Sequence, residues 1–157
     1  MSGAAHQMLD AIKLHRLRRA DEPAVRQLIE AALMEHWGKV EAAAHPDLAQ
    51  LFDHYAQSIF LVAEAGDRII GCGALVAEAD GGGRIVRMVV APEWRHHGLG
   101  GRLLQSLLDA ARALGYQTVQ QETPAHWQDA VRFYQSHGFT LVKEQAGSAH
   151  FSLALAA

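Results

Sequence analysis

The chain has 157 residues, half of them hydrophobic and a fifth charged, and this balance is typical of one soluble globular domain. The formal net charge of −3 offers no broad basic surface for nucleic acid, and no apolar run is long enough to span a bilayer. One cysteine, Cys72, excludes a disulfide framework within the chain, which fits a cytoplasmic protein. The ten histidines are scattered, so we expect no metal site.

The N-terminal part of the chain is expected to alternate between strand and helix. Residues 1–11 read as an extension, and a single domain is expected over residues 12–157. The stretch 13–20 is a candidate edge strand, and the apolar spacing of 21–37 predicts a helix. Residues 45–57 read as a second, shorter helix that starts at a proline.

The rest of the chain is richer in β-branched residues. Residues 58–79 hold two apolar runs broken at Gly66 and Asp67, which predicts a β-hairpin. The elements expected after it are strand 85–92, helix 99–114, strand 116–123, helix 128–138 and a closing hairpin of 139–145 with 150–155. Hairpins and helices that follow strands indicate an α/β (α+β) fold, with a mixed, mostly antiparallel central sheet and helices on both faces.

The most unusual stretch is WRHHGLGGRLL, residues 94–104, between a predicted strand and a predicted helix. The first N–H groups of a helix have no partner within the helix and carry partial positive charge, which favours an anion. Glycines let a phosphate approach the backbone without a Cβ in the way. A glycine cluster also fits a plain tight turn, and neither the Walker motif nor the dinucleotide fingerprint is present.

This stretch and a second motif resemble the GNAT superfamily of acetyl-CoA-dependent N-acetyltransferases. In VVAPEWRHHGLGGRLL (89–104), Arg95, Gly98 and Gly100 occupy the Arg/Gln-x-x-Gly-x-Gly/Ala positions. AVRFYQSHGF (130–139) is similar to the family's A-x-x-(F/L)-Y-x-x-x-G-F. The resemblance extends over nearly the whole chain and implies the GNAT-like acyl-CoA N-acyltransferase fold.

The resemblance implies that acetyl-CoA, and coenzyme A after transfer, bind at the glycine-rich turn. The diphosphate is expected among the backbone and side chains of Arg95, His96, His97, Gly98, Leu99, Gly100, Gly101 and Arg102. The pantetheine arm is expected to pair with the backbone of the preceding strand at Met88, Val89 and Val90, where two parallel strands splay apart.

The resemblance also implies a general acid, Tyr134, which would protonate the departing sulfur of coenzyme A and contact the cosubstrate. A phenol is protonated at neutral pH and can donate, although Tyr134 also fits a packing role in a short helix. The family's usual glutamate is missing near Arg84. Glu122 is the acidic candidate for the base, and a strand-end carboxylate in a surface salt bridge is the alternative. His126 reads as a solvated loop histidine.

The expected function is transfer of an acetyl group from acetyl-CoA to a primary amine of a small-molecule acceptor. A protein N-terminal or lysine acetyltransferase and a non-catalytic CoA-binding regulatory module are the alternatives. No nucleic-acid or membrane partner is expected. The C-terminal stretch HFSLALAA (150–157) could extend a sheet across subunits, which predicts a homodimer.

Overall fold

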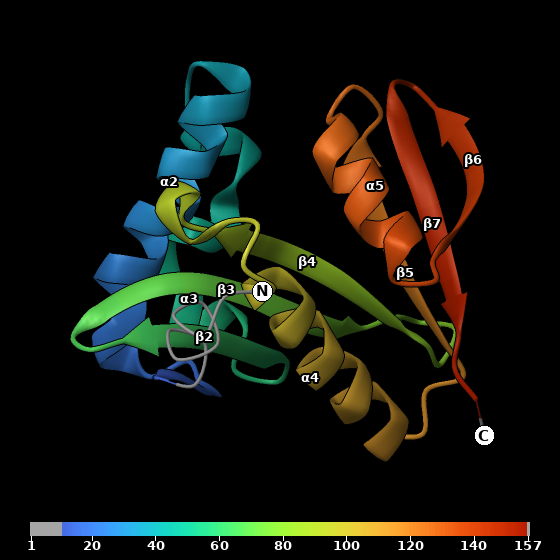
Figure 1. The fold of residues 1–157 in the computed structure, drawn as a ribbon, viewed down its shortest axis with the longest axis horizontal. Coiled ribbons are helices and arrows are strands. Elements are labelled where there is room, and N and C mark those ends of the chain that lie inside the picture. Colours follow the sequence, from blue (N-terminus) through green and yellow to red (C-terminus); the bar gives the residue numbers. More distant parts are fainter. Residues whose placement is uncertain (1–10, 157) are drawn as a thin grey trace.

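A computed structural model describes residues 11–156, which form one seven-stranded sheet with helices on both faces (Figure 1). The predicted extension, residues 1–11, lies outside the described residues except for Ala11. The strands are β1 (Ile12–Arg16), β2 (Ile59–Ala65), β3 (Arg68–Ala77), β4 (Gly83–Val90), β5 (Thr118–Pro124), β6 (Thr140–Gln145) and β7 (Ser148–Ala154). The α-helices are α2 (Glu22–Trp37), α3 (Leu51–His54), α4 (Leu99–Ala113) and α5 (Gln128–Ser136).

The sheet has the strand order β1-β2-β3-β4-β5-β7-β6, and the prediction of a mixed, mostly antiparallel sheet is confirmed. Among the seven described strands, only β4 and β5 pair in parallel, and their pairing runs from Gly83 opposite Val119 to Ile85 opposite Gln121. Beyond these positions the two strands diverge, as Figure 1 shows. The sheet therefore opens into a fork, which we call the β4–β5 gap.

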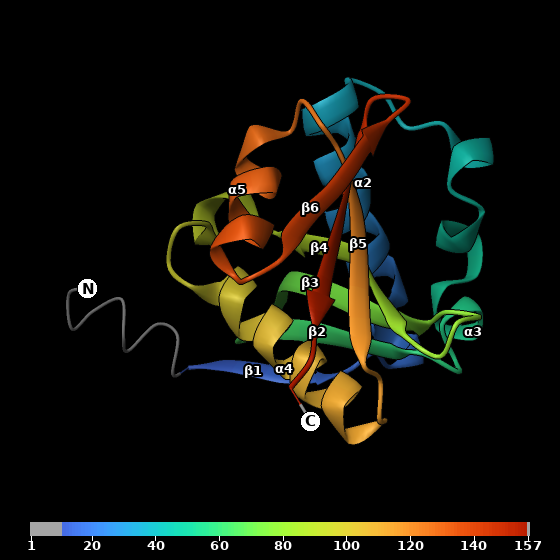
Figure 2. The same cartoon turned by 90° about the vertical axis from the view of Figure 1, so that its right-hand side faces the viewer.

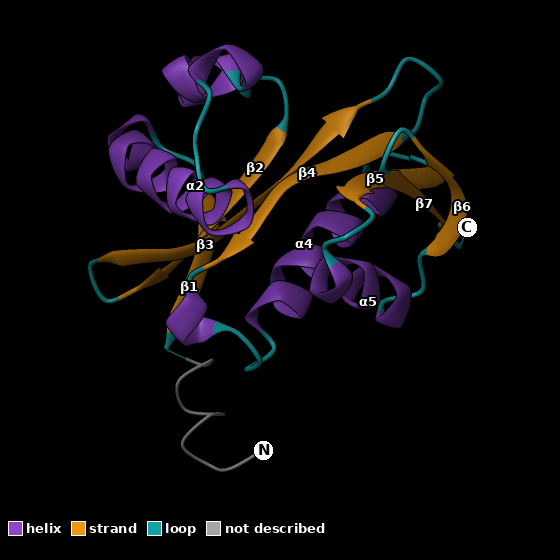
Figure 3. Ribbon diagram, turned by 90° about the horizontal axis from the view of Figure 1, so that it is seen from above, coloured by secondary structure: helices purple, strands orange, loops and turns teal. Residues whose placement is uncertain are grey.

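Helices cover the two faces of the sheet in different places (Figure 3). On one face, α2 packs Val25, Ile29 and Leu33 onto β2 and β3. On the other face, the leucine stripe of α4 packs onto β3 and β4, and α5 lies over the C-terminal strands. In Figure 2, α5 and α4 lie to the left of β5, and α2 lies behind it. The gap therefore lies between α2 on one side and α4 and α5 on the other.

The helix predicted for 45–57 is wrong in part, because a 3-10 helix over Pro46–Gln50 precedes the single turn of α3. In a continuous α-helix the Phe52 N–H would donate to the Leu48 carbonyl. Instead, that carbonyl accepts from Arg26 Nε at 2.6 Å, and Phe52 N–H donates to Glu22 Oε1 at 2.6 Å. Side chains of α2 thus take the backbone groups that an α-helix would need.

The proposed extension of the sheet through the C-terminal strand is also wrong. Strand β7 lies between β5 and β6 and pairs with both, so it has no open edge for a second chain. The edge strand on this side is β6. The homodimer itself stays a prediction. Within residues 11–156, no helix has both the length and the apolar character needed to cross a membrane.

Candidate active site

The open edge of β4 forms one side of the β4–β5 gap. The N–H of Ala91 donates to Ile70 of β3 at 2.9 Å, and the backbone groups of successive strand residues point to opposite sides. Met88 and Val90 therefore direct their backbone groups toward the gap, whereas Val89 directs its groups toward β3. Of the stretch predicted to pair with the pantetheine arm, Met88 and Val90 have the required orientation.

A β-bulge at Arg87 interrupts β4 just before this edge. The register with β3 shifts between Cys72 and Ala74, and Arg87 has a φ of 55°. The guanidinium donates to Asp47 at 2.7 and 2.9 Å, and the Tyr55 hydroxyl donates to the same carboxylate at 2.6 Å. Burial opposes ionisation of Asp47, but the hydrogen bonds from Arg87 and Tyr55 hold its pKa below the usual value.

This buried network fixes the segment between α2 and β2 to the strand that borders the gap. Neither Arg87 nor Asp47 was predicted from the sequence. A signal was present, because a cation inside the apolar run IVRMVV requires a partner when it is buried. The partner lies 40 residues away in the chain, and nothing in the local sequence points to it.

Each glycine of the glycine-rich turn meets a structural requirement of the fold. Gly98 is the N-cap of α4 and has a φ of 87°, a conformation that L side chains rarely adopt. A Cβ on Gly100 would lie 3.1 Å from the Phe133 ring, and one on Gly101 would lie 2.9 Å from His137 Nε2. The last two glycines thus let α5 approach the first turn of α4. This packing role was not predicted from the sequence, where the glycines were assigned to phosphate access.

The first intrahelical bond of α4 runs from Arg102 N–H to the Gly98 carbonyl at 3.1 Å. The N–H groups of Leu99, Gly100 and Gly101 precede it and have no partner within the helix. Leu99 itself is buried, whereas His96 and Arg102 are exposed and His97 is half-buried at the same turn. The arrangement fits an anion at this helix terminus.

Arg95 turns away from this helix terminus. Its Nε donates to the Val90 carbonyl at 3.0 Å, and its two outer nitrogens donate to Glu35 at 2.8 and 2.7 Å. Glu35 belongs to the last turn of α2, so the pair joins α2 to the loop between β4 and α4. The charge of Arg95 is therefore balanced within the protein.

Tyr134 of α5 lies beneath the fork. It is 3 % exposed and belongs to the same core cluster as Ile85 and Val119, which sit where β4 and β5 still pair. Its hydroxyl makes no hydrogen bond to any residue in the described range 11–156. Burial raises the pKa of this phenol, so the group stays protonated at neutral pH. A protonated donor without a partner is suited to general-acid chemistry.

Glu122 follows the last rung of the β4–β5 pairing. Its carboxylate lies 3.9 Å from Arg84 Nη1 and 3.7 Å from His150 Nε2, and the side chain is 47 % exposed. These contacts match the surface salt bridge that the sequence analysis left open as an alternative. His126 is exposed and packs edge-on against Trp37, at 5.4 Å between ring centroids.

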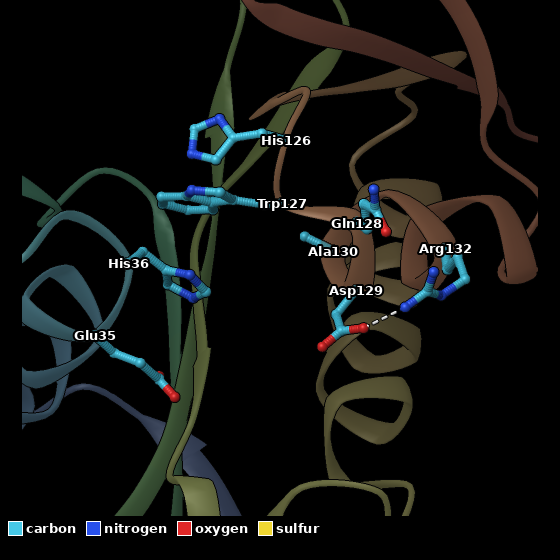
Figure 4. Close-up of a pocket in the computed structure, with 8 residues that line it drawn as sticks. All are labelled: Glu35, His36, His126, Trp127, Gln128, Asp129, Ala130 and Arg132. Carbon is cyan, nitrogen blue, oxygen red and sulfur yellow. Dashed lines mark hydrogen bonds and ion pairs between the residues drawn. The ribbon is translucent and has the colours of Figure 1, made fainter.

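A cavity of about 390 Å³ lies between the end of α2 and the start of α5 (Figure 4). Its lining residues are Glu35, His36, His126, Trp127, Gln128, Asp129, Ala130 and Arg132. The Trp127 ring stacks on His36 at 4.2 Å, so the loop after β5 reaches across to α2. The buried Trp127 Nε1 has no acceptor among the described residues. Most of the residues that line the cavity are polar, which suits a ligand with hydrogen-bonding groups.

Two other groups of side chains are poorly suited to catalysis or to metal binding. Cys72 is buried, and burial raises the pKa of its thiol to about 12, so it is a poor nucleophile. His15, Asp21 and Glu64 bring possible metal-ligand atoms within 4.8 Å of one another. Arg18 donates to both carboxylates of this cluster, and its positive charge already occupies the position where a cation would bind.

The fold and the site together describe an acyl-CoA-dependent transferase, and comparison with known proteins agrees. Residues 56–141 match the family model of the acetyltransferase (GNAT) domain. An "IAA acetyltransferase" of Azospirillum brasilense is 35 % identical over 120 residues, which cover 75 % of this chain and 78 % of that protein. An "Amino-acid acetyltransferase" of Mycobacterium tuberculosis is 32 % identical over 133 residues, which cover 83 % and 69 % of the two chains.

Solved acetyltransferase structures share the fold. The PaiA N-acetyltransferase from Thermoplasma acidophilum in complex with coenzyme A superimposes with a TM-score of 0.78 and 17 % identity, covering 92 % of this chain and 99 % of that chain. The chain belongs to the GNAT acetyltransferase family, as the two sequence motifs predicted. Acetyl-CoA is the cosubstrate of this family.

Proposed function

We propose that this protein transfers the acetyl group of acetyl-CoA directly to a primary amine of a small-molecule acceptor. The observation that carries the proposal is Tyr134, a residue only 3 % exposed that lies beneath the fork of β4 and β5 and whose hydroxyl makes no hydrogen bond to the described residues. A thioester held in the gap would bring its sulfur to a donor that is protonated and unoccupied.

In this proposal the cosubstrate lies along the open edge of β4. The diphosphate accepts hydrogen bonds from the N–H groups of Leu99, Gly100 and Gly101 at the start of α4. The amide groups of the pantetheine arm pair with the backbone of Met88 and Val90, which faces the gap. The N–H groups at the start of α4 have no partner within the helix, whereas the Val90 carbonyl already accepts from Arg95 Nε at 3.0 Å, so the pantetheine arm would share that carbonyl or use the Met88 backbone.

The chemistry requires a neutral amine, because an ammonium group has no lone pair. The amine nitrogen attacks the thioester carbonyl carbon, a C–N bond forms, and the C–S bond breaks. The nitrogen gives up its proton to Glu122, directly or through water, and Tyr134 gives its proton to the departing thiolate. The products are the N-acetylated acceptor and the free thiol of coenzyme A. No protein nucleophile is needed, which agrees with the buried Cys72.

The acceptor is proposed to be a free amino acid or a similar small amine. A cavity of about 390 Å³ is in the range that small ligands occupy. One of the relatives is named an amino-acid acetyltransferase, and an amino acid carries both the amine and a carboxylate. His36, His126 and Gln128 in the lining supply hydrogen-bonding groups for such a ligand.

The first test is thermal denaturation with acetyl-CoA and coenzyme A, with ATP and NAD as controls. A ligand at a hundred times its Kd adds about 2.7 kcal/mol of stability, and we expect this rise with the two CoA compounds only. No rise with either compound would overturn the cosubstrate site.

The second test measures release of the CoA thiol with a panel of acceptors. Free amino acids, their methyl esters, polyamines and short peptides are compared at equal concentration. The proposal expects free amino acids to react fastest and their esters to react poorly. Preference for peptides would support a protein acetyltransferase instead. Binding of CoA without thiol release from any acceptor would support the regulatory module.

A further inference from the structure

The ion pair between Glu35 and Arg95 connects α2 to the residue that opens the phosphate-binding turn. Glu35 receives both outer nitrogens of the guanidinium, at 2.8 and 2.7 Å, in the parallel geometry that favours Arg–carboxylate pairs. The third nitrogen of Arg95 is held by the Val90 carbonyl at 3.0 Å. The hydrogen bond from Arg95 lowers the pKa of Glu35, which keeps the pair charged above acidic pH.

The turn that follows Arg95 holds an unfavourable backbone conformation. His96 has a φ of 64°, a value that is unfavourable for a residue with a side chain. Such a conformation persists only where its surroundings hold it in place. Arg95, with three hydrogen bonds to β4 and α2, fixes the residue just before His96, and Gly98 at a φ of 87° follows.

We propose that Glu35 is a positioning residue for the cosubstrate. By holding Arg95, it keeps residues 95–98 in the conformation that aims the first N–H groups of α4 at the diphosphate. The inference rests on the proposed function, which places the diphosphate there. It differs from the sequence expectation for Arg95, since the guanidinium acts on the shape of the turn and does not contact the phosphate.

The alternative, direct contact between Arg95 and the diphosphate, predicts the opposite effect of Glu35 on cosubstrate binding. If Arg95 bound the diphosphate directly, Glu35 would compete with the ligand for the guanidinium, and removing the carboxylate would strengthen binding. If Glu35 positions the turn, removing the carboxylate weakens binding. Glu35→Gln separates the two cases because it keeps the size of the side chain and removes its charge.

The experiment measures the Kd of coenzyme A by calorimetry for the wild type, Glu35→Gln, Arg95→Gln and the double variant. We expect each single variant to weaken binding at least fivefold and the double variant to be no weaker than the weaker single one. Non-additivity of this kind indicates that the two side chains act as one unit. Both side chains are partly exposed, so the thermal midpoint without ligand should change little.

Glu93→Gln is the matched control. Glu93 lies close enough to Arg95 to act on its charge, but it is bonded to Arg68 at 2.8 Å. This variant removes an equal charge beside the turn and leaves the hydrogen bonds of Arg95 intact, so the Kd should stay within twofold.

Tighter binding by Glu35→Gln together with weaker binding by Arg95→Gln would overturn the proposal and make Arg95 a direct ligand. An unchanged Kd for Glu35→Gln would also overturn it. If the wild type does not bind coenzyme A at all, the proposed function fails first, and this inference falls with it. The wild-type titration therefore distinguishes the two failures.

Discussion

On the α4–α5 side of the β4–β5 gap, glycines of α4 leave room for the rings of Phe133 and His137, whereas on the α2 side ion pairs connect the elements. Gly100 and Gly101 let Phe133 and His137 approach α4 closely. On the other side, Glu35 and Asp47 hold two arginines that border the gap. Close packing fixes geometry at low cost, while ion pairs depend on both partners being present. The two sides should therefore fail in different ways when they are altered.

The largest loss of stability is expected on the charged side, from Asp47→Ala. The change leaves the Arg87 guanidinium and the Tyr55 hydroxyl without their shared acceptor in a largely buried position. Removal of one partner from a buried pair should lower the free energy of unfolding by about 3 kcal/mol, measured by urea denaturation. The control is Asp53→Ala, which breaks an exposed pair with Arg19 and should cost less than about 1 kcal/mol. Equal losses would show that burial of the network is unimportant.

The same network predicts a pH dependence. The pKa of Asp47 in the folded protein is lowered, so its contribution to stability is complete above the unfolded pKa of about 3.9 and is lost as pH falls below it. Asp47→Asn lacks this contribution. We expect the difference in unfolding free energy between wild type and Asp47→Asn to be constant near neutral pH and to shrink below about pH 4. A difference that stays constant down to pH 2 would contradict this assignment.

On the packed side, Tyr134→Phe should lower activity without loss of structure. The hydroxyl has no partner among the described residues, so its removal leaves no polar group unsatisfied. Loss of a general acid should reduce kcat about 100-fold, while the Kd of coenzyme A stays within about twofold. Tyr116→Phe, outside the gap, is the control. Unchanged turnover in Tyr134→Phe would assign the ring to packing alone.

A smaller effect is expected from Gly100→Val, which tests the close approach of the two helices. Even one added carbon would lie 3.1 Å from the Phe133 ring, and the branched side chain must push α5 away from α4. Overpacking of this kind should cost about 2 kcal/mol of unfolding free energy and weaken CoA binding. Ala113→Val, at an exposed position of the same helix, carries the same side chain and should be nearly neutral.

The difference between the two sides also decided what the sequence could reveal. The order of strands and helices and the position of the glycine-rich turn followed from local spacing, as at Gly66, Gly98 and Gly138, where positive φ marks turns and helix ends. The motif around Tyr134 was readable because a short, ordered set of residues carries it. These signals come from residues that are close together in the sequence, and the α4–α5 side of the gap is built largely from such residues.

The charged side could not be predicted because its determinants are pairs distant in sequence. Glu35 and Arg95 are 60 residues apart, and the helix expected over 45–57 changed because Glu22 and Arg26 took its backbone groups. Periodicity describes which face of a segment is apolar, but it contains no information on which charge meets which. A single sequence therefore contains more information about the α4–α5 side of the gap than about the α2 side.

The smallest expected effect is a gain in stability from His96→Gly. Glycine adopts a φ of 64° without strain, and after its own entropic cost the net gain should be about 0.5 kcal/mol. Ala146→Gly, at a φ of 53° in the β6–β7 turn, should give a similar gain and leave CoA binding unchanged. If Arg95 and Glu35 serve to hold the strained turn, Glu35→Gln should weaken CoA binding less in the His96→Gly background than in the wild type. An equal loss in both backgrounds would separate the ion pair from the strain, and the charged side would then act on the cosubstrate by some other contact.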